Sequence, residues 1–285
     1  MSPIDRIAVV GGGTMGNGIA HVCALHGREV VLVDVSSDVL GRALASIEKN
    51  LARQVEKGIV DDEERVAALA RIRTDTHLPG AVADADIVVE AVPERAALKH
   101  DVFEALDRHA PTGAILASNT SSISITAIGG RTDRPERVVG MHFMNPVPVM
   151  ELVEVIRGAA TSDETVAEVV ELARELGKTP VEVSDFPGFV SNRVLMPMIN
   201  EAAFALMEGV AEAEAIDTVM TLGMNHPMGP LALADLIGLD TCVSILEVLH
   251  SELGDDKYRP CPLLRRHVAA GWLGRKSGRG FYDYD

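Results

Sequence analysis

Cysteine is scarce in this chain of 285 residues, which contains only Cys23, Cys242 and Cys261. Their number is odd, they are widely spaced, and none belongs to a CxxC pair. These features argue against a disulfide framework and against a cysteine zinc site. We therefore expect reduced, buried thiols and no bound metal.

Positive charge is also in short supply. The 26 lysines and arginines face 42 acidic residues, which gives a formal net charge of −16 at pH 7. The electric field of this negative charge repels phosphate backbones and anionic membrane surfaces. Neither nucleic acid nor a membrane is an expected partner.

A long hydrophobic run is missing near the N-terminus. The apolar segment 7–10 stops at three glycines, which makes it too short for a signal-peptide core or a membrane span. The first expected strand begins almost at Met1 and leaves no room for a targeting segment. A cytoplasmic location is therefore expected.

The remaining composition, with 47% hydrophobic and 24% charged residues, is typical of a globular protein, and the length favours two domains. Buried-strand patterns at 4–10, 29–33, 87–92 and 114–118 alternate with helical patterns, which predicts a parallel sheet with crossover helices. Two further strands, 138–143 and 152–156, flank a Pro-rich turn and form a plausible hairpin-like pair. A helix at 163–176 and a strand at 181–183 follow, and the patterns from 189 onward are helical.

These patterns predict an α/β fold class. A Rossmann-type, doubly wound and mostly parallel sheet occupies residues 1–185 and carries a helical arm at about 38–70. An all-helical C-terminal domain spans residues 186–285.

A glycine-rich turn follows the first strand and opens a helix. Gly11, Gly13 and Gly16 form GxGxxG in the context that dinucleotide binding requires: a tight turn, backbone close to the pyrophosphate, and close packing of helix on strand. Asp34, 18 residues after Gly16, ends the next strand, where a carboxylate accepts hydrogen bonds from the adenosine ribose. Residues 35–40 contain no lysine or arginine, so NAD is favoured over NADP. The alternative is a purely structural turn with Asp34 as a helix cap. The turn also contributes Thr14 and Met15 to the expected cofactor contacts.

His142 ends a strand, and Glu154 lies in the next strand twelve residues later. Histidine suits proton transfer at neutral pH, and a carboxylate on its other ring nitrogen fixes the tautomer. The pattern is that of a catalytic dyad, although a single histidine in a strand is often structural. Glu151 is a competing carboxylate; because strand residues alternate faces, at most one of the two acids faces His142.

Several sequence words appear together in one order: SNTSS at 118–122, HFMNPVPVM at 142–150, PGFVSNR at 187–193, PMGP at 227–230, GLD at 238–240 and KSGRGFY at 276–282. With these words the chain closely resembles the L-3-hydroxyacyl-CoA dehydrogenases over nearly its whole length. The resemblance implies that His142 is the catalytic base and Glu154 its partner. It also implies that Ser121 and Asn192 hydrogen-bond the substrate oxygen, although either could instead be a capping residue.

The same resemblance places a further group of residues on the nicotinamide half of NAD or its ribose and phosphate. A surface charge or a turn residue is the simpler reading of each. The group consists of Glu94, Lys99, Asn119, Asn145 and Lys276.

The helical arm carries positive charge that could meet the phosphates of coenzyme A. Lys49, Arg53 and Lys57 are spaced at i, i+4 and i+8 on one helix stripe. By resemblance, Lys57 matches a CoA-contacting lysine, and Asn50 stands where some family members have serine. Interleaved glutamates leave open that this face is simply solvated.

The resemblance implies reversible NAD-dependent oxidation of an L-3-hydroxyacyl-CoA, with 3-hydroxybutyryl-CoA the expected substrate, and a homodimer formed through the helical domain. The helix at 189–208 has apolar positions that suit a dimer seam or burial within the subunit: Leu195, Ile199, Ala202, Ala203 and Leu206. Two alternatives remain, a dehydrogenase of free 3-hydroxy or sugar acids and a non-catalytic NAD-binding sensor.

Overall fold

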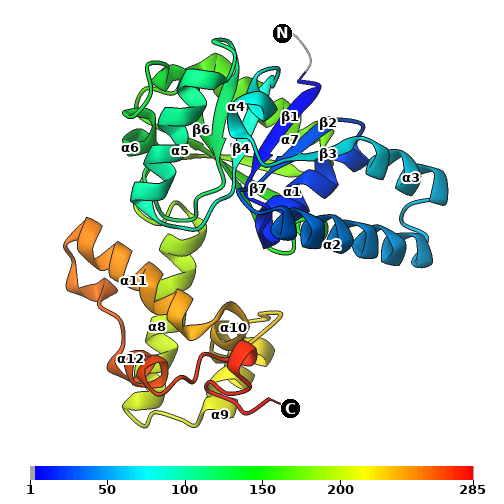
Figure 1. The fold of residues 1–285 in the computed structure, drawn as a ribbon. Coiled ribbons are helices and arrows are strands. Elements are labelled where there is room, and N and C mark those ends of the chain that lie inside the picture. Colours follow the sequence, from blue (N-terminus) through cyan, green and yellow to red (C-terminus); the bar gives the residue numbers. More distant parts are fainter. Residues whose placement is uncertain (1–3, 285) are drawn as a thin grey trace. The chain divides into compact units, whose positions relative to one another are not determined.

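The computed structural model describes residues 4–284, and residues 1–3 and 285 lie outside the described part. The chain divides into two compact units between Asp185 and Phe186 (Figure 1). Within the described residues, no helix is both long enough and apolar enough to cross a membrane.

The first unit is organised around one sheet, which contains eight strands in the part of the chain described, in the order β3-β2-β1-β4-β5-β6-β7-β8. The strands are β1 (Arg6–Val10), β2 (Glu29–Val33), β3 (Ile72–Asp75), β4 (Ile87–Glu90), β5 (Ile115–Ser118), β6 (Val138–Phe143), β7 (Leu152–Arg157) and β8 (Thr179–Ser184). Strands β1 to β6 pair in parallel, β7 runs antiparallel to β6, and β8 is parallel to β7. The predicted fold class is confirmed, and so is the antiparallel pairing of 138–143 with 152–156.

Helices cover both faces of the sheet because its central strands are apolar on both sides. The helices of the first unit are α1 (Thr14–Leu25), α2 (Ser37–Glu56), α3 (Asp62–Ala70), α4 (Leu78–Val82), α5 (Ala96–His109), α6 (Ile125–Gly129) and α7 (Asp163–Glu175). Helices α1 and α7 pack on one face, and the arm of α2 and α3 packs against α1, while α4, α5 and α6 contact strands through the other.

Four short elements of this unit were not predicted: β3, α4, α6 and the 3-10 turn Pro135–Arg137. Strand β3 has the sequence IRTD and is only partly buried, so it lacks the apolar signal of its neighbours. The two helices have five residues each, which is too short for a helical period to show. Their place in the fold depends on tertiary packing rather than on local pattern.

The second unit is helical. Its helices are α8 (Ser191–Met207), α9 (Ala213–Thr218), α10 (Pro230–Ile237), α11 (Leu239–Leu253) and α12 (Pro262–Ala269), joined by a π-helical turn (Val219–Gly223) and 3-10 turns at Asp256–Tyr258 and Arg275–Ser277. In α8, Ile199, Ala202 and Ala203 are buried in this unit's own core, and Leu195 and Leu206 pack against it. Of the two explanations for the apolar positions of this helix, a dimer seam or burial within the subunit, burial within the subunit therefore accounts for them.

Two buried carboxylates fasten the C-terminal segment to this unit. Asp235 accepts hydrogen bonds from the backbone N–H groups of Phe281 and Tyr282, at 2.9 and 3.0 Å, and from the Tyr284 hydroxyl at 3.0 Å. Asp217 accepts the Tyr282 hydroxyl at 2.8 Å and two N–H groups at the start of α10. Because every donor is supplied by the chain, these carboxylates can be buried without an opposite charge.

The three cysteines are buried and unpaired, as expected. Burial raises the pKa of the Cys23 and Cys242 thiols to about 12, so both stay protonated at neutral pH. Protonated, enclosed thiols are poor nucleophiles.

Candidate active site

A cavity of about 710 Å³ opens where β1, β2, β4 and β5 end. The carboxyl ends of parallel strands meet at one edge of a sheet, and the loops that follow them form the walls. The lining residues come from the ends of β1 and β2, from the loops that follow the strands, and from the helices α1, α2, α4 and α5: Val10, Gly11, Gly13, Thr14, Met15, Val33, Asp34, Val35, Val39, Thr76, Leu78, Ala91, Val92, Pro93, Glu94, Arg95, Leu98, Val102, Asn119 and Ser121.

The glycine turn at this cavity leaves room for a phosphate. A Cβ at Gly11 would lie 2.5 Å from the Ala91 carbonyl oxygen, and one at Gly16 would lie 1.7 Å from the Gly11 carbonyl oxygen, so both positions exclude a side chain. A Cβ at Gly13 would meet no atom within 4 Å. Gly13 is the N-cap of α1 and provides no capping side chain, so the helix N-terminus faces the cavity unscreened. The backbone N–H groups at this helix N-terminus suit the pyrophosphate of a dinucleotide.

Asp34 lies beside the glycine turn in the cavity wall, directly after β2. Its carboxylate accepts the Gly12 N–H at 2.8 Å and the Ser36 N–H at 3.1 Å, which fixes the side chain at the cavity edge. Ser36, not Asp34, is the N-cap of α2 and accepts from the Val39 N–H. The alternative of Asp34 as the helix cap is therefore wrong, and its remaining acceptor capacity fits the ribose hydroxyls.

The structure brings His142, Glu154 and Ser121 together. His142 in β6 and Glu154 in β7 are direct partners in the antiparallel register, and Nδ1 of His142 lies 2.9 Å from Oε2 of Glu154. Nε2 of His142 lies 3.1 Å from Oγ of Ser121, which follows β5. The His142 and Glu154 side chains are 8% and 3% exposed. Glu151 precedes β7 and is exposed, so it is not the carboxylate on His142.

This arrangement can move a proton. When Nδ1 donates to the Glu154 carboxylate, Nε2 carries a lone pair and can accept a proton from a hydroxyl beside Ser121. The carboxylate then stabilises the imidazolium that forms. The catalytic roles of these three residues remain predictions that the geometry permits.

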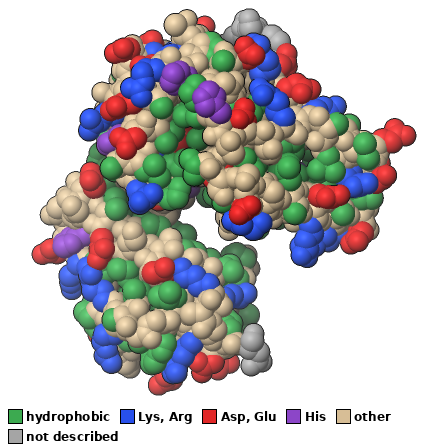
Figure 2. Space-filling view, viewed as in Figure 1, with side chains coloured by type: hydrophobic (Ala, Val, Ile, Leu, Met, Phe, Trp, Pro, Cys, Tyr) green, Lys and Arg blue, Asp and Glu red, His purple; other side chains and the backbone are tan. Residues whose placement is uncertain are grey.

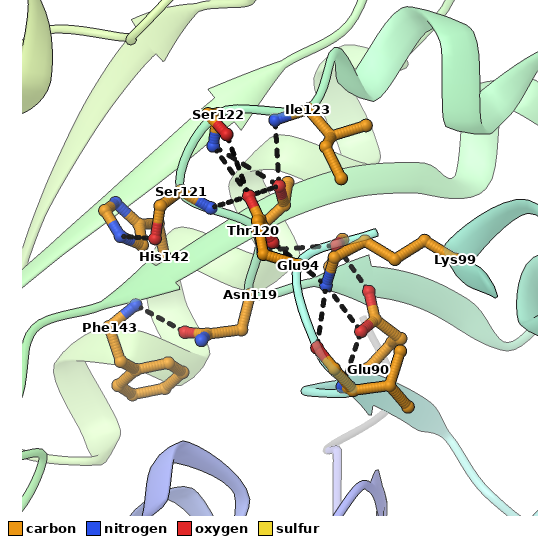
Figure 3. Close-up of polar contacts among 12 residues, drawn as sticks. Glu90, Glu94, Lys99, Asn119, Thr120, Ser121, Ser122, Ile123, His142 and Phe143 are labelled. Atoms are coloured by element: carbon orange, nitrogen blue, oxygen red, sulfur yellow. Dashed lines mark hydrogen bonds and ion pairs between the residues drawn. The ribbon is translucent and has the colours of Figure 1, made fainter. Parts of the chain in front are cut away.

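Glu94 organises the loop that carries Ser121 (Figure 3). Its Oε1 accepts hydrogen bonds from the Thr120 hydroxyl at 2.6 Å, the Ser121 N–H at 2.9 Å, and the Ser122 N–H and hydroxyl at 3.0 and 3.1 Å. Burial alone would raise the pKa of Glu94, but the Lys99 ammonium and these donors lower it below its usual value. The carboxylate is therefore ionised at neutral pH.

Lys99 lies behind the cavity and is not one of its lining residues. Its side chain is 1% exposed, and Nζ lies 2.7 Å from Oε1 of Glu90 and 3.4 Å from Oε2 of Glu94. Glu90, at the end of β4, is fully buried and also accepts the Ser118 hydroxyl at 2.7 Å and the Val92 N–H at 2.7 Å. Lys99 therefore fixes Glu90 and Glu94 in this structure, and its contact with a cofactor remains a prediction.

Asn119 and Asn145 lie on either side of β6 in the chain. Asn119 lines the cavity, and its Oδ1 accepts the Phe143 N–H at 2.9 Å, which ties the β5 loop to β6. Asn145 is exposed in the loop after β6. Lys178 holds this loop by donating to the carbonyl oxygens of Val147 and Met150 at 2.7 and 2.8 Å.

Two expected site residues belong to the second unit. Asn192 is buried in the first turn of α8. Lys276 lies in the turn Arg275–Ser277 and pairs with Asp240 at 2.5 Å. Their roles toward substrate and cofactor remain predictions.

The helical arm carries its cations on an exposed surface. Lys49, Arg53 and Lys57 are exposed, whereas Asn50 is partly buried. The buried stripe of α2 consists of Leu40, Ala43, Ile47 and Leu51. Figure 2 shows basic and acidic side chains mixed over the arm, as the interleaved glutamates indicated.

Sequence reasoning missed several residues of this site. Glu90 had a signal, because an acid that ends the otherwise apolar strand IVVE is unusual in a fully buried sheet. Lys178 had none, since its contact is with backbone oxygens far away in the chain. Other missed wall residues are dispersed and mostly apolar: Val35, Thr76, Leu78, Leu98 and Val102.

Known proteins are similar to this chain over nearly its whole length. A family model described as "3-hydroxyacyl-CoA dehydrogenase, NAD binding domain" matches residues 6–186, and one described as "3-hydroxyacyl-CoA dehydrogenase, C-terminal domain" matches residues 188–284. The chain is 61% identical over 282 residues to a probable 3-hydroxybutyryl-CoA dehydrogenase of Bacillus subtilis, covering 99% of this chain and 98% of that one. It is 56% identical to the 3-hydroxybutyryl-CoA dehydrogenase of Bradyrhizobium diazoefficiens, covering 99% and 96%.

A solved structure is similar as well. The (S)-3-hydroxybutyryl-CoA dehydrogenase of Ralstonia eutropha matches with a TM-score of 0.96 at 51% identity, and the match covers 99% of each chain.

Replacing individual glycines of the turn tests whether the turn binds the cofactor. Gly16→Ala should lower the free energy of unfolding by about 2–3 kcal/mol because the new Cβ clashes with backbone. Gly13→Ala should leave that free energy within about 0.5 kcal/mol but raise the Kd for NAD by roughly tenfold or more, because its methyl group enters open space beside the helix N-terminus. Urea unfolding and calorimetric titration measure the two quantities.

Gly41→Ala in α2 is the matched control, because its Cβ also meets nothing within 4 Å but lies away from the cavity. It should leave NAD binding unchanged. Unchanged NAD binding by Gly13→Ala would contradict a pyrophosphate at this turn.

Proposed function

The chain belongs to the 3-hydroxyacyl-CoA dehydrogenase family and contains its NAD-binding domain, and on this basis we propose that its substrate is 3-hydroxybutyryl-CoA. The reaction is the reversible NAD-dependent oxidation of an L-3-hydroxyacyl-CoA to the 3-ketoacyl-CoA. The observation that best supports it is the continuous line of contacts from Ser121 through His142 to Glu154.

Each residue of this line has one role in the proposed mechanism. NAD, when bound, supplies the ring that accepts hydride from C3. Nε2 of His142 accepts the proton of the substrate hydroxyl, and Glu154 holds the imidazole in the required tautomer and stabilises its charged form. Ser121 hydrogen-bonds the substrate oxygen as it becomes a carbonyl, and Asn192 has the amide chemistry for the same task.

Coenzyme A is proposed to bind on the helical arm. Among residues 4–284, no carboxylate forms an ion pair with Lys49, Arg53 or Lys57, so their charges are available to phosphate groups. In a protein with a net charge of −16, such a local group of cations is the feature that would attract an anionic substrate. Lys57 and Asn50 are the proposed contacts.

We also propose a cytoplasmic homodimer that forms through the second unit. Large apolar side chains are exposed on that unit, and a second copy would cover them: Val194, Val210, Val219, Leu222, Met224 and Leu236. The buried, unpaired thiols fit a reducing compartment.

Light scattering of the purified chain should give twice its mass of 30.4 kDa, and a single-chain mass at micromolar concentration would reject the dimer.

Removing the base tests the mechanism. His142→Ala should lower turnover of acetoacetyl-CoA with NADH by about 10²–10⁴-fold, the usual scale of general-base catalysis. Glu154→Gln should lower it less, because the base remains but loses its charged partner, and Glu151→Gln is the matched control. Near-normal turnover by His142→Ala would refute the assignment. Comparable turnover of free 3-hydroxybutyrate would instead favour a dehydrogenase of free acids.

Removing a cation from the arm tests the CoA site. Lys57→Ala should raise the KM for acetoacetyl-CoA by about 2–5-fold with kcat unchanged, since one exposed charge pair contributes up to about 1 kcal/mol. The effect should shrink at high salt, because salt screens exposed charges. Arg108→Ala, which removes an exposed cation from α5, should leave KM unchanged. Equal KM values for the two variants would place CoA elsewhere.

A further inference from the structure

The Glu94 carboxylate presents a charge to the cofactor cavity as well as holding the Ser121 loop. The four donors from residues 120–122 all converge on Oε1. The side chain keeps 37% of its surface exposed and is part of the cavity wall. The same carboxylate therefore touches the catalytic loop on one side and the space for the cofactor on the other.

The buried ammonium below it does not cancel this charge. Lys99 lies between two carboxylates, at 2.7 Å from Glu90 and 3.4 Å from Glu94. Glu90 is fully buried and is the closer partner, so the single positive charge is needed first to compensate Glu90. One net negative charge remains for the three groups, and Glu94 is the member that faces the cavity.

The proposed function determines which part of NAD would meet this charge. The hydride and the hydroxyl proton leave the same carbon and its oxygen, so the nicotinamide ring must lie at the Ser121 and His142 end of the cavity. Ser121 and Glu94 both line that end, and they are joined by a hydrogen bond of 2.9 Å. The nicotinamide ring is a cation in NAD⁺ and neutral in NADH, so a fixed negative charge interacts with the two forms differently.

We propose that the negative charge of Glu94 favours binding of NAD⁺ over NADH. This inference rests on the proposed function in one respect, namely that the nicotinamide ring lies at the Ser121 end of the cavity. Oxidation of the substrate converts NAD⁺ to NADH, and the neutral ring of NADH is no longer attracted to the Glu94 carboxylate. The loss of this attraction promotes release of NADH.

The test compares cofactor affinities without any acyl-CoA. The Kd values for NAD⁺ and NADH are measured by calorimetry on the full-length chain and on Glu94→Gln, which removes the charge but keeps the shape of the side chain. The ratio Kd(NAD⁺)/Kd(NADH) should rise by about 3–10-fold, mainly through weaker binding of NAD⁺. Glu94→Asp keeps the charge and should keep the ratio within about twofold.

Asp101→Asn is the matched control, since it removes one exposed negative charge from the same helix, α5, away from the cavity wall. Its ratio should equal that of the unmodified chain. Thermal unfolding is followed for every variant, and Glu94→Ser provides the neutral side chain if Glu94→Gln does not unfold cooperatively.

One result would overturn the inference: an unchanged ratio in the neutral variant. If both Kd values rise by the same factor, Glu94 makes a geometric contact only; if neither changes, the cofactor does not sense its charge. Turnover of acetoacetyl-CoA is measured separately on the unmodified chain. An unchanged ratio beside normal turnover refutes the role of Glu94 alone. A chain that binds both cofactors but turns over no acyl-CoA refutes the proposed function instead.

Discussion

The parallel pairing of β1, β2, β4 and β5 is the constraint on which the site of the first unit depends. Parallel strands end at one edge of the sheet, so the residues that follow them must share one region of space whatever their distance along the chain. Gly11, Asp34, Glu94 and Ser121 follow four different strands and line one cavity for this reason.

The reversal between β6 and β7 adds what a purely parallel sheet cannot provide. An antiparallel pair places residues directly opposite each other on one face, and this register sets Glu154 beside His142. A carboxylate in the segment after β4 has a complementary effect, because Glu94 holds the loop that brings Ser121 to the other ring nitrogen. The histidine is thus fixed from two sides by elements that are remote in sequence.

The sequence predicted correctly those parts of the molecule whose signal lies in a few adjacent residues. The glycine turn, the acid after β2 and the apolar strands carry their signals in a few adjacent residues, so the fold class and the NAD cofactor followed from the sequence. The contact between His142 and Glu154 could be proposed because a short turn separates their strands. By contrast, the buried position of Lys99 could not be foreseen, since a lysine on a helix is usually exposed, and only packing against Glu90 explains it. The same holds for Lys178, whose partners are backbone oxygens, and for β3, whose polar sequence gives no strand signal.

The open sheet also has two edges, β3 and β8, and each has a row of backbone groups that could recruit a strand from another molecule. Strand β3 is four residues long and contains Arg73 and Asp75, so a second strand would gain little pairing and meet charge. Strand β8 contains Pro180, which has no N–H to donate, and Glu182, whose carboxylate pairs with Arg157. Both edges are therefore poor templates for intermolecular sheet growth, which protects the protein from aggregation at high concentration in the cell.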